Sequence, residues 1–439
     1  MLGNRVGLQD RLFYAFDLED RVPNDHLLRR LDAVLDLAWL RAELAPFYSH
    51  TGRPSVDPEL MIRMLLVGYC YSIRSERRLC QEVELNLAYR WFCRLGLEDA
   101  VPDHSTFSVN RHGRFRNSDI LRSVFENVVR RCVEAGLVGG EGFAVDASVI
   151  EADASRFVRV EGSEIDWTDE QQARRPIREY LDALDGEPSP VNPRHKPRAL
   201  SPTDPSAAWT TRGRNKVMFG YSLNYLIDME NAVIVDVEAT PTRISREVEA
   251  TETMIERTSS TFDLKPERIA GDVAYGTGRM LGWLTDQRIE PHIPVWDKGR
   301  RNDGTLSRGD FTFDRDRDVY VCPEGKTLRT TGTVHDGKTL LYRSSKRDCD
   351  SCPLKPRCCP RTPSRKIPRD INEAARDYAR SLNGSEAYNQ SARDRKKIER
   401  LFGEAKRNLA MTRLRLRGPS GARDEFLLTA TVQNLRRLI

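Results

Sequence analysis

The hydrophobic pattern of this chain changes at Gly142, and the change divides the chain into two kinds of structure. From about residue 25 to residue 137, apolar residues recur at intervals of three and four, which is the spacing of amphipathic helices that pack together. After Gly142, short apolar runs begin with Phe143–Ile150, a pattern typical of buried strands. We therefore expect an all-helical domain over residues 1–140 and an α/β domain after it.

The second part of the chain alternates strands and helices. Strands are expected at 143–150, 217–227, 232–239, up to 270 and at 289–294, and helices at 168–184, 246–258 and 278–287. This order predicts a mixed α/β sheet as a core whose first part covers residues 141–296. Residues 297–385, with short strands and five cysteines, are expected to form an inserted β-rich subdomain. Residues 386–439 then return to the core with helices at 391–408 and 423–438.

Composition argues against a membrane-spanning protein and favours a polyanionic partner. No run of about 18 apolar residues occurs, so no transmembrane helix is expected. The N-terminus lacks the apolar region of a signal peptide, and we expect a cytoplasmic protein. Lys and Arg number 70 against 65 Asp and Glu, but residues 393–417 alone hold ten Lys or Arg against three acids. Such a concentrated basic segment favours nucleic acid as the partner.

The helix expected around residues 393–407 carries one carboxylate among cations. Arg395, Glu399 and Lys406 fall within about 60° of one another on a helix. The opposite side holds an apolar stripe made of Ile398, Leu401, Phe402 and Ala405. By itself the segment is typical of a solvated surface helix, and the alternative is a helix that brings a metal-binding carboxylate up to a phosphate backbone.

Two further acids stand at strands. Asp146 interrupts an apolar strand, where a carboxylate is costly unless it is paired or bound to metal. Asp272 follows an apolar strand, at the edge where open α/β sheets place ligands. Either residue alone could be a cap or turn residue. Together with Glu399, however, they can hold two Mg²⁺ ions about 4 Å apart through oxygen, one activating a water or a 3′-hydroxyl and the other stabilising the leaving oxygen.

The three acids lie in the motifs Ala144-Val-Asp146-Ala-Ser, Gly271-Asp272-Val-Ala-Tyr275 and Ile398-Glu399-Arg-Leu-Phe402-Gly-Glu-Ala-Lys406. In this order they resemble the DDE transposases of bacterial insertion sequences. Asp25-His-Leu-Leu-Arg-Arg and Pro102-Asp-His-Ser-Thr-Phe-Ser are similar to the helical N-terminal DNA-binding region of that family. The likeness covers roughly residues 20–439 and implies a ribonuclease-H-like catalytic core.

The resemblance implies a transposase that binds terminal inverted repeats, cleaves DNA at transposon ends by two-metal phosphodiester hydrolysis and transfers the 3′-hydroxyl ends into target DNA. Asp146, Asp272 and Glu399 would bind two Mg²⁺ or Mn²⁺ ions. The partner would be double-stranded DNA, bound by at least a dimer, in the cytoplasm of a bacterium in association with its nucleoid. Two alternatives stay open: a domesticated, non-catalytic DNA-binding regulator, and a ribonuclease-H-like nuclease without strand transfer.

Around Glu399 the likeness is to the Tyr-Arg-Glu-Lys signature of the family. It implies that Arg395 and Lys406 contact DNA phosphate, and the adjacent Arg400 is a further candidate for DNA binding. The Tyr of the signature falls on Ala392, so the likeness leaves open whether the hairpin-end mechanism associated with the full signature applies.

Glu404 is a rival for the third acid. It lies about 140° round the helix from Glu399, away from the cations on the Glu399 face. We therefore prefer Glu399.

A segment before Gly142 is a second candidate for DNA contact. Residues 101–108 combine a Pro-Asp turn with Ser and Thr, and Arg111 and Arg114 follow. This pattern is typical of a helix-turn-helix reader, and equally of an ordinary helical bundle. Arg111 and Arg114 are DNA-binding candidates on the first interpretation.

Five of the nine cysteines gather late in the chain. Cys322, Cys349, Cys352 and Cys358 suit a tetrahedral structural Zn²⁺ site, and the alternative is free thiols in a loop-rich insertion. The cations around them suggest that the insertion also touches DNA; they are Arg343, Lys346, Arg347, Lys355, Arg357, Arg361, Arg365 and Lys366.

Overall fold

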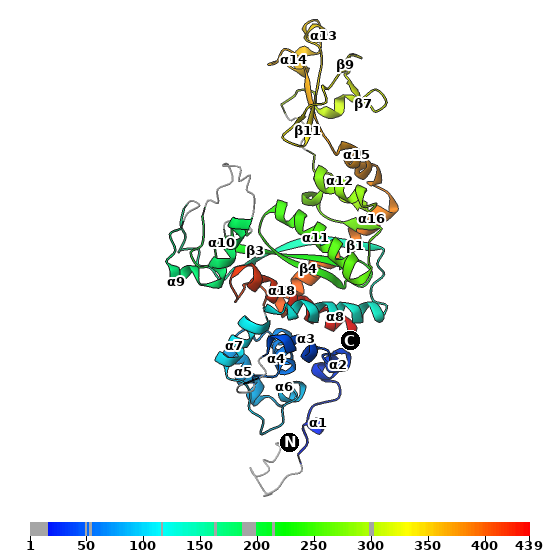
Figure 1. Cartoon of the computed structure of the whole chain (residues 1–439). Helices are drawn as coiled ribbons and strands as arrows, with labels where there is room; N and C mark the ends of the chain where they lie inside the picture. Colours follow the sequence, from blue (N-terminus) through cyan, green and yellow to red (C-terminus); the bar gives the residue numbers. More distant parts are fainter. Residues whose placement is uncertain are drawn as a thin grey trace, which may run out of the picture.

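The computed structural model of the chain describes residues 16–48, 51, 55–115, 117–161, 165–186, 199–212, 216–297 and 303–439. Figure 1 shows an elongated molecule, with a helical region at one end, a sheet in the middle and a small-stranded insertion at the other end.

The N-terminal region is helical throughout its described residues. Its helices are α1 (Leu18–Arg21), α2 (Leu27–Val34), α3 (Leu40–Leu44), α4 (Pro58–Cys70), α5 (Glu76–Leu85), α6 (Leu87–Phe92), α7 (His104–Asn110) and α8 (Ile120–Glu134). Several begin at the residues that favour a helix start. Asp57 caps α4 ahead of Pro58, and Ser75 caps α5, because their side-chain oxygens accept N–H groups that a first turn leaves unpaired. The predicted helical region is confirmed.

The central sheet contains antiparallel and parallel strands. Its order is β4 (Ile234–Pro241), β3 (Lys216–Asp228), β1 (Gly142–Glu151), β5 (Arg268–Ala270) and β6 (Glu290–His292), and β2 (Ala208–Arg212) also pairs with β3. The pairs β4–β3 and β3–β1 are antiparallel, and β1–β5 and β5–β6 are parallel. The mixed α/β sheet is thus confirmed, while β2 was not predicted.

Helices cover both faces of this sheet. On one face, side chains such as Ala144, Tyr225 and Ile227 share a core with the N-terminal helices, α17 (Lys396–Asn408) and α18 (Gly418–Leu438). On the other face, Phe143 and Val145 pack with α11 (Ile244–Phe262), α12 (Gly278–Asp286) and α15 (Glu373–Leu382). Because successive strand residues face opposite sides, Asp146 lies on the α17 side.

The helix α18 lies between the N-terminal region and the sheet. It packs against α8, α4, α2 and β4. The buried amide of Asn434 accepts from the Ile234 N–H at 2.9 Å and donates to the Ile234 carbonyl at 2.8 Å. Among the described strands, β4 pairs only with β3. This pair of bonds joins β4 to α18 as well.

The insertion contains two antiparallel sheets of three short strands. One consists of β7 (Thr312–Asp314), β8 (Val319–Val321) and β9 (Thr327–Leu328), and the other of β10 (Val334–His335), β11 (Thr339–Arg343) and β12 (Lys366–Asp370). The short helices α13 (Lys346–Asp350) and α14 (Lys355–Cys358) complete it. The next helix, α15, places Ala375 and Ala379 in the core with α12. It therefore packs with the central sheet, and its Glu373 also pairs with Arg308 of the insertion at 3.0 Å.

Two predicted helices are each divided in two. The segment expected at 391–408 forms α16 (Glu386–Asp394) and α17, which meet at Arg395. The helix expected at 168–184 forms α9 (Asp169–Gln172) and α10 (Arg175–Gly186). Among the described residues, none of the helices combines the length and apolar character that crossing a membrane would need.

Replacing Asn434 by Ala should destabilise the fold by about 2–4 kcal/mol, because it leaves the buried N–H and carbonyl of Ile234 without partners. Urea unfolding followed by circular dichroism measures the effect. Arg437→Ala, at an exposed residue of the same helix, is the control and should change little. An Asn434→Ala midpoint equal to that of the wild type would contradict the role given to this amide.

Candidate active site

Three acids from three elements converge at the end of the parallel part of the sheet. Ala144 of β1 pairs with Ala270 of β5, and Asp146 and Asp272 each follow two residues later. They therefore lie level with each other on neighbouring strands. Glu399 lies in the first turn of α17, which packs against β1. The negative charges of Asp272 and Glu399 both act on Asp146, so the structure brings the three predicted acids together.

The placement of α17 depends on Tyr225, the residue opposite Asp146 on β3. The ring of Phe402 stacks on the Tyr225 ring, with centroids 4.9 Å apart and planes inclined by 14°. The Tyr225 hydroxyl donates to Gln433 of α18 at 2.8 Å, and the Gln433 amide donates to the Leu401 carbonyl at 2.9 Å. These contacts hold the predicted apolar stripe of α17 against the sheet and leave Glu399 exposed beside β1.

The carboxyl group of Asp146 is largely buried and lies close to other charged side chains. Burial raises the pKa of Asp146 to about 6, opposed by the Ala147 N–H and by the Arg395 guanidinium, and the charges of Asp272 and Glu399 add to the rise. The Asp272 carboxylate accepts the Ala274 N–H at 2.8 Å, which fixes its orientation. A bound cation would favour the ionised form of Asp146, because its positive charge would offset the cost of burying a carboxylate.

Two predicted cations lie on the same face of β1 as this acid. Arg395 Nη1 lies 3.2 Å from Asp146 Oδ2, and both side chains are about one-fifth exposed, at 23% and 20%. Lys406 Nζ donates to Ser148 Oγ at 2.6 Å, two residues along the strand from Asp146. Arg400 is exposed on α17. Positive charge thus lies on both sides of the acids, along one edge of α17.

The rival acid Glu404 faces another way. Its two oxygens lie 3.4 Å from Arg436 Nη1 and 3.3 Å from Gln433 Nε2, both on α18. Glu404 therefore helps to attach α17 to α18, and this contact supports the choice of Glu399.

The two N-terminal candidates differ in position. Arg111 is buried, at 5% exposure, and pairs with Glu76 at 3.0 Å. The prediction that Arg111 contacts DNA is wrong for this arrangement, because its charge is used inside the helical region. Arg114 is half-buried, donates to Ser55 Oγ at 2.7 Å and lies over the Tyr48 ring.

Sequence reasoning missed two groups near the acids. The hydroxyl of Tyr275 is buried without a hydrogen-bond partner among the described residues, and the charges of Glu247, Asp146 and Asp272 raise its pKa further after burial has raised it. Glu247 of α11 accepts from Ser222 Oγ at 2.7 Å. Burial raises its pKa, and the charge of Asp272 adds to the rise. Tyr275 stands in the Asp272 motif, but nothing local in the sequence indicates Glu247.

The chemistry of the three acids suits a hard divalent cation, since all donors are carboxylate oxygens. Within the described ranges, however, no three His, Cys, Asp or Glu side chains already surround a point where an ion would fit. Arg395 instead pairs with Asp146 Oδ2. A cation bound at Asp146 would compete with this guanidinium for the carboxylate.

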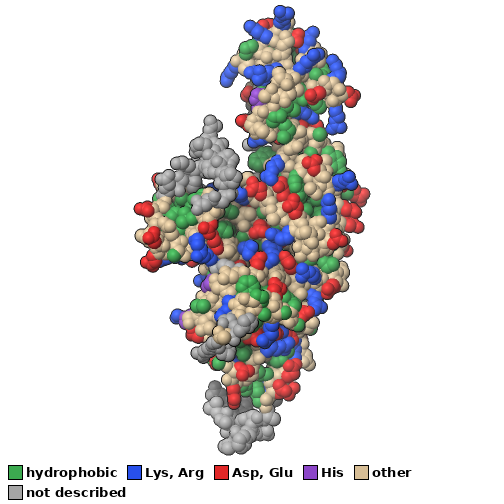
Figure 2. Space-filling model, in the orientation of Figure 1, with side chains coloured by type: hydrophobic (Ala, Val, Ile, Leu, Met, Phe, Trp, Pro, Cys, Tyr) green, Lys and Arg blue, Asp and Glu red, His purple; other side chains and the backbone are tan. Residues whose placement is uncertain are grey.

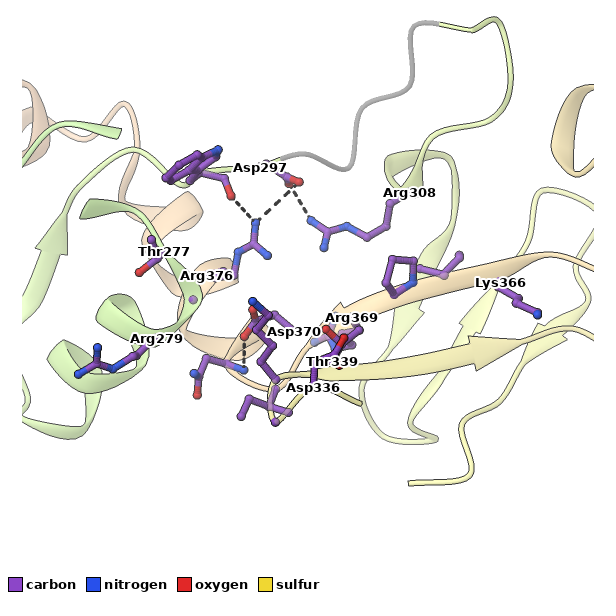
Figure 3. A pocket seen from close by; sticks show the side chains of 18 of the residues that line it. Thr277, Arg279, Asp297, Arg308, Asp336, Thr339, Lys366, Arg369, Asp370 and Arg376 are labelled. Carbon is purple, nitrogen blue, oxygen red and sulfur yellow. Dashed lines mark hydrogen bonds and ion pairs between the residues drawn. The ribbon is translucent and has the colours of Figure 1, made fainter. Parts of the chain in front are cut away.

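A cleft of about 1100 Å³ lies elsewhere, between the insertion and the face of the sheet that α11 and α12 cover. Its walls include Thr277 and Arg279 at the start of α12 and residues 366–370 of β12. Figure 3 shows Arg308 and Arg376 directed at Asp297, at 2.7 Å and 3.7 Å. None of the three acids lines this cleft. Its Arg308 and Arg376 are engaged with Asp297, so the chemistry favours the acid site over this cleft.

Comparison with known proteins points to the same chemistry. Residues 16–113 match the family model described as a transposase domain (DUF772), and residues 321–439 match the model described as a transposase DDE domain. The second match includes Glu399, whereas Asp146 and Asp272 precede it. The chain is thus similar to transposases over these two segments, and DDE transposases generally use divalent metals.

Among solved structures, the chain is similar to a cryo-EM structure of the piggyBac transposase synaptic complex with hairpin DNA. The match has 10% sequence identity, covers 92% of this chain and 71% of that chain, and has a TM-score of 0.34. A likeness at this level supports no conclusion by itself.

Asp146→Asn should stabilise the metal-free chain at pH 8 by about 1–2 kcal/mol. The raised pKa of Asp146 means that the folded chain keeps a proton between about pH 4 and 6 that the unfolded chain loses. Folding of the wild type therefore weakens as the pH rises through this window, and Asn removes that cost.

Thermal unfolding in EDTA from pH 4 to pH 8 measures this difference. It should shrink as the pH falls towards 4, where the folded carboxyl is protonated and the unfolded carboxyl becomes partly protonated. A variant less stable than the wild type at pH 8 would show that the pair with Arg395 outweighs the burial of Asp146.

Proposed function

We propose that this chain is a transposase that binds the terminal inverted repeats of its element, cleaves DNA at those ends and transfers the freed 3′-hydroxyl ends into target DNA. The observation that carries the proposal is the convergence of Asp146, Asp272 and Glu399 between Arg395 and Lys406, in a chain with a DDE transposase domain. Because two ends must be held together, we expect at least a dimer on DNA.

In this proposal Asp146, Asp272 and Glu399 would hold two Mg²⁺ or Mn²⁺ ions through their carboxylate oxygens. Bound there, the ions would lower the pKa of the attacking hydroxyl and stabilise the leaving oxygen. The carboxylates then act as ligands, and none of them has to serve as a general base. The buried hydroxyl of Tyr275 lies close enough to Asp146 and Asp272 to feel their charges.

The cations of α17 would position the DNA. Without metal, Arg395 neutralises Asp146 at 3.2 Å. When cations neutralise the acids instead, the guanidinium becomes available for a phosphate beside the scissile bond. Lys406, held at Ser148, would meet a second phosphate along the same face. Such contacts orient the backbone without reading sequence.

Glu399→Gln, Asp146→Asn and Asp272→Asn should each reduce Mg²⁺-dependent cleavage of DNA that carries the element's ends by more than about 100-fold, with end binding largely retained. Each change removes a charged ligand and keeps the size of the side chain. The matched control is Glu404→Gln, on the same helix, which should keep cleavage within a few-fold of the wild type.

The products of this assay decide between related functions. Joined strands are expected from a transposase, whereas cut ends that are never joined would indicate a nuclease. A wild type that binds ends but never cuts with Mg²⁺ or Mn²⁺ would indicate a regulator. Undiminished cleavage by Glu399→Gln would overturn the site.

Arg395→Gln should weaken DNA binding in the presence of Ca²⁺ and lower the slope of log affinity against log salt by about 1, because one phosphate contact is lost. The loss should be the same on end DNA and on unrelated DNA. Fluorescence anisotropy across a salt series measures both quantities, with the exposed Arg437→Gln as control. A loss confined to end DNA would instead indicate base reading by Arg395.

A further inference from the structure

The insertion contains a group of thiols that the proposed function does not use. Cys349, Cys358 and Cys359 are buried in its core with Phe311, Tyr320, Leu328, Tyr342 and Ile367, and Cys322 packs against that core. The thiol of Cys359 is hydrogen-bonded to those of Cys349 and Cys358. Cys349 and Cys322 lie close enough to Cys358 for their charges to raise its pKa. Residues from three separate turns of the chain therefore meet at one point.

The backbone around Cys322 is arranged to support a thiolate. Cys322-Pro-Glu-Gly forms a tight turn, in which the Gly325 N–H donates to the Cys322 carbonyl at 2.8 Å and Gly325 has a φ of +70°. The Lys326 N–H then donates to Cys322 Sγ at 3.3 Å. A hydrogen bond from backbone to sulfur stabilises negative charge on that sulfur.

A second turn supplies the paired cysteines. Cys349 lies in α13, and the Cys352 N–H donates to the Cys349 carbonyl at 3.3 Å. Residues three apart on a helical turn lie on the same side, so Cys352 is placed to approach the ion that Cys349 approaches. The Ser344 hydroxyl lies 3.0 Å from Cys349 Sγ, a second polar contact to a sulfur.

The size of the insertion makes a further bond necessary. Its strands have only two to five residues, and its buried core consists of the eight residues named above. Units this small rarely hold a fold by apolar burial alone and use disulfides or metals. All nine cysteines of the chain are free of disulfides, and a bound metal would supply a cross-link of the kind that small units use.

We propose that the insertion binds one structural Zn²⁺ ion through Cys322, Cys349, Cys352 and Cys358. The four thiols lose their protons to solvent, and the four thiolates coordinate the ion tetrahedrally. We place Cys352 and not Cys359 in the ligand set, because Cys349 and Cys352 have the Cys-x-x-Cys spacing of structural zinc sites.

Binding of the ion changes local contacts. Across the described part of the chain, no three such side chains are already arranged around an ion. Cys359 is instead hydrogen-bonded to Cys349 and Cys358, and binding of the ion would replace these bonds. Arg365 supplies nearby positive charge, since it is buried and donates to the Cys358 carbonyl at 2.8 Å and to the Leu306 carbonyl at 2.7 Å. Arg365 is therefore structural, and its predicted role in DNA contact is wrong.

The ion would fix the end of the molecule that carries exposed cations. Figure 2 shows Lys and Arg side chains around the free end of the insertion. Lys346, Arg347, Arg357 and Arg361 are exposed there, on or beside α13 and α14. The two helices also hold two of the four proposed ligands, Cys349 and Cys358, so the zinc site would set the spacing of these cations.

The test is the zinc content of the full chain, purified under reducing conditions without chelator. Plasma mass spectrometry should find about one zinc per chain. Cys322→Ser, Cys349→Ser, Cys352→Ser and Cys358→Ser should each lose it, and Cys359→Ser should keep it. Cys132→Ser, in the helical region, is a second control.

Cobalt provides a readout that is independent of DNA chemistry. Co²⁺ added to the metal-free chain should give the visible and near-ultraviolet absorption of a tetrahedral thiolate complex, and Cys352→Ser should weaken the thiolate band. Limited proteolysis should then cut metal-free protein within residues 303–370 and spare the zinc form.

Absence of zinc and of the cobalt spectrum, with all five late thiols open to a thiol reagent in the folded chain, would overturn the proposal. Retention of zinc by Cys352→Ser together with its loss from Cys359→Ser would overturn this ligand set. Neither result bears on the three acids, whose Mg²⁺-dependent cleavage is measured separately.

Discussion

The ion pair between Arg395 and Asp146 is the interaction on which the site depends. A carboxylate in the middle of an apolar strand must be neutralised, and burial alone raises the pKa of Asp146. Without metal, the guanidinium at 3.2 Å supplies the opposite charge. With metal, the same carboxylate would be neutralised by the ion, and the cation would be free for DNA. In this proposal Asp146 therefore links the stability of the fold to the binding of metal and of DNA phosphate.

The rest of the fold brings α17 to that strand. Tyr225 lies opposite Asp146 and stacks on Phe402, and Gln433 joins Tyr225 to the backbone of α17. The same helix α18 packs against the N-terminal helices, so the region proposed to bind transposon ends and the acid site share one buried core. The proposed zinc site acts at the opposite end of the molecule, where it would hold an exposed group of cations.

Local sequence pattern was enough to predict the strand of Asp146, the apolar stripe of α17 and the alternation of strands and helices in a mixed sheet, because periodicity is a local property. It did not predict that the helix divides into α16 and α17 at Arg395, because Arg395 itself keeps helical backbone angles. It also failed for Arg111, whose partner Glu76 is 35 residues away. Contacts between distant segments also bear on the choice between Glu399 and Glu404. The contact of Glu404 with Arg436 supports Glu399, which the helical angle alone already favoured.

The most direct measurement is a structure of the chain bound to DNA that carries its element's end, with Mn²⁺ located by anomalous diffraction. The account predicts manganese between Asp146, Asp272 and Glu399, with Arg395 turned from Asp146 to a DNA phosphate. Manganese at other residues, or an intact pair of Arg395 with Asp146 beside cleaved DNA, would contradict it.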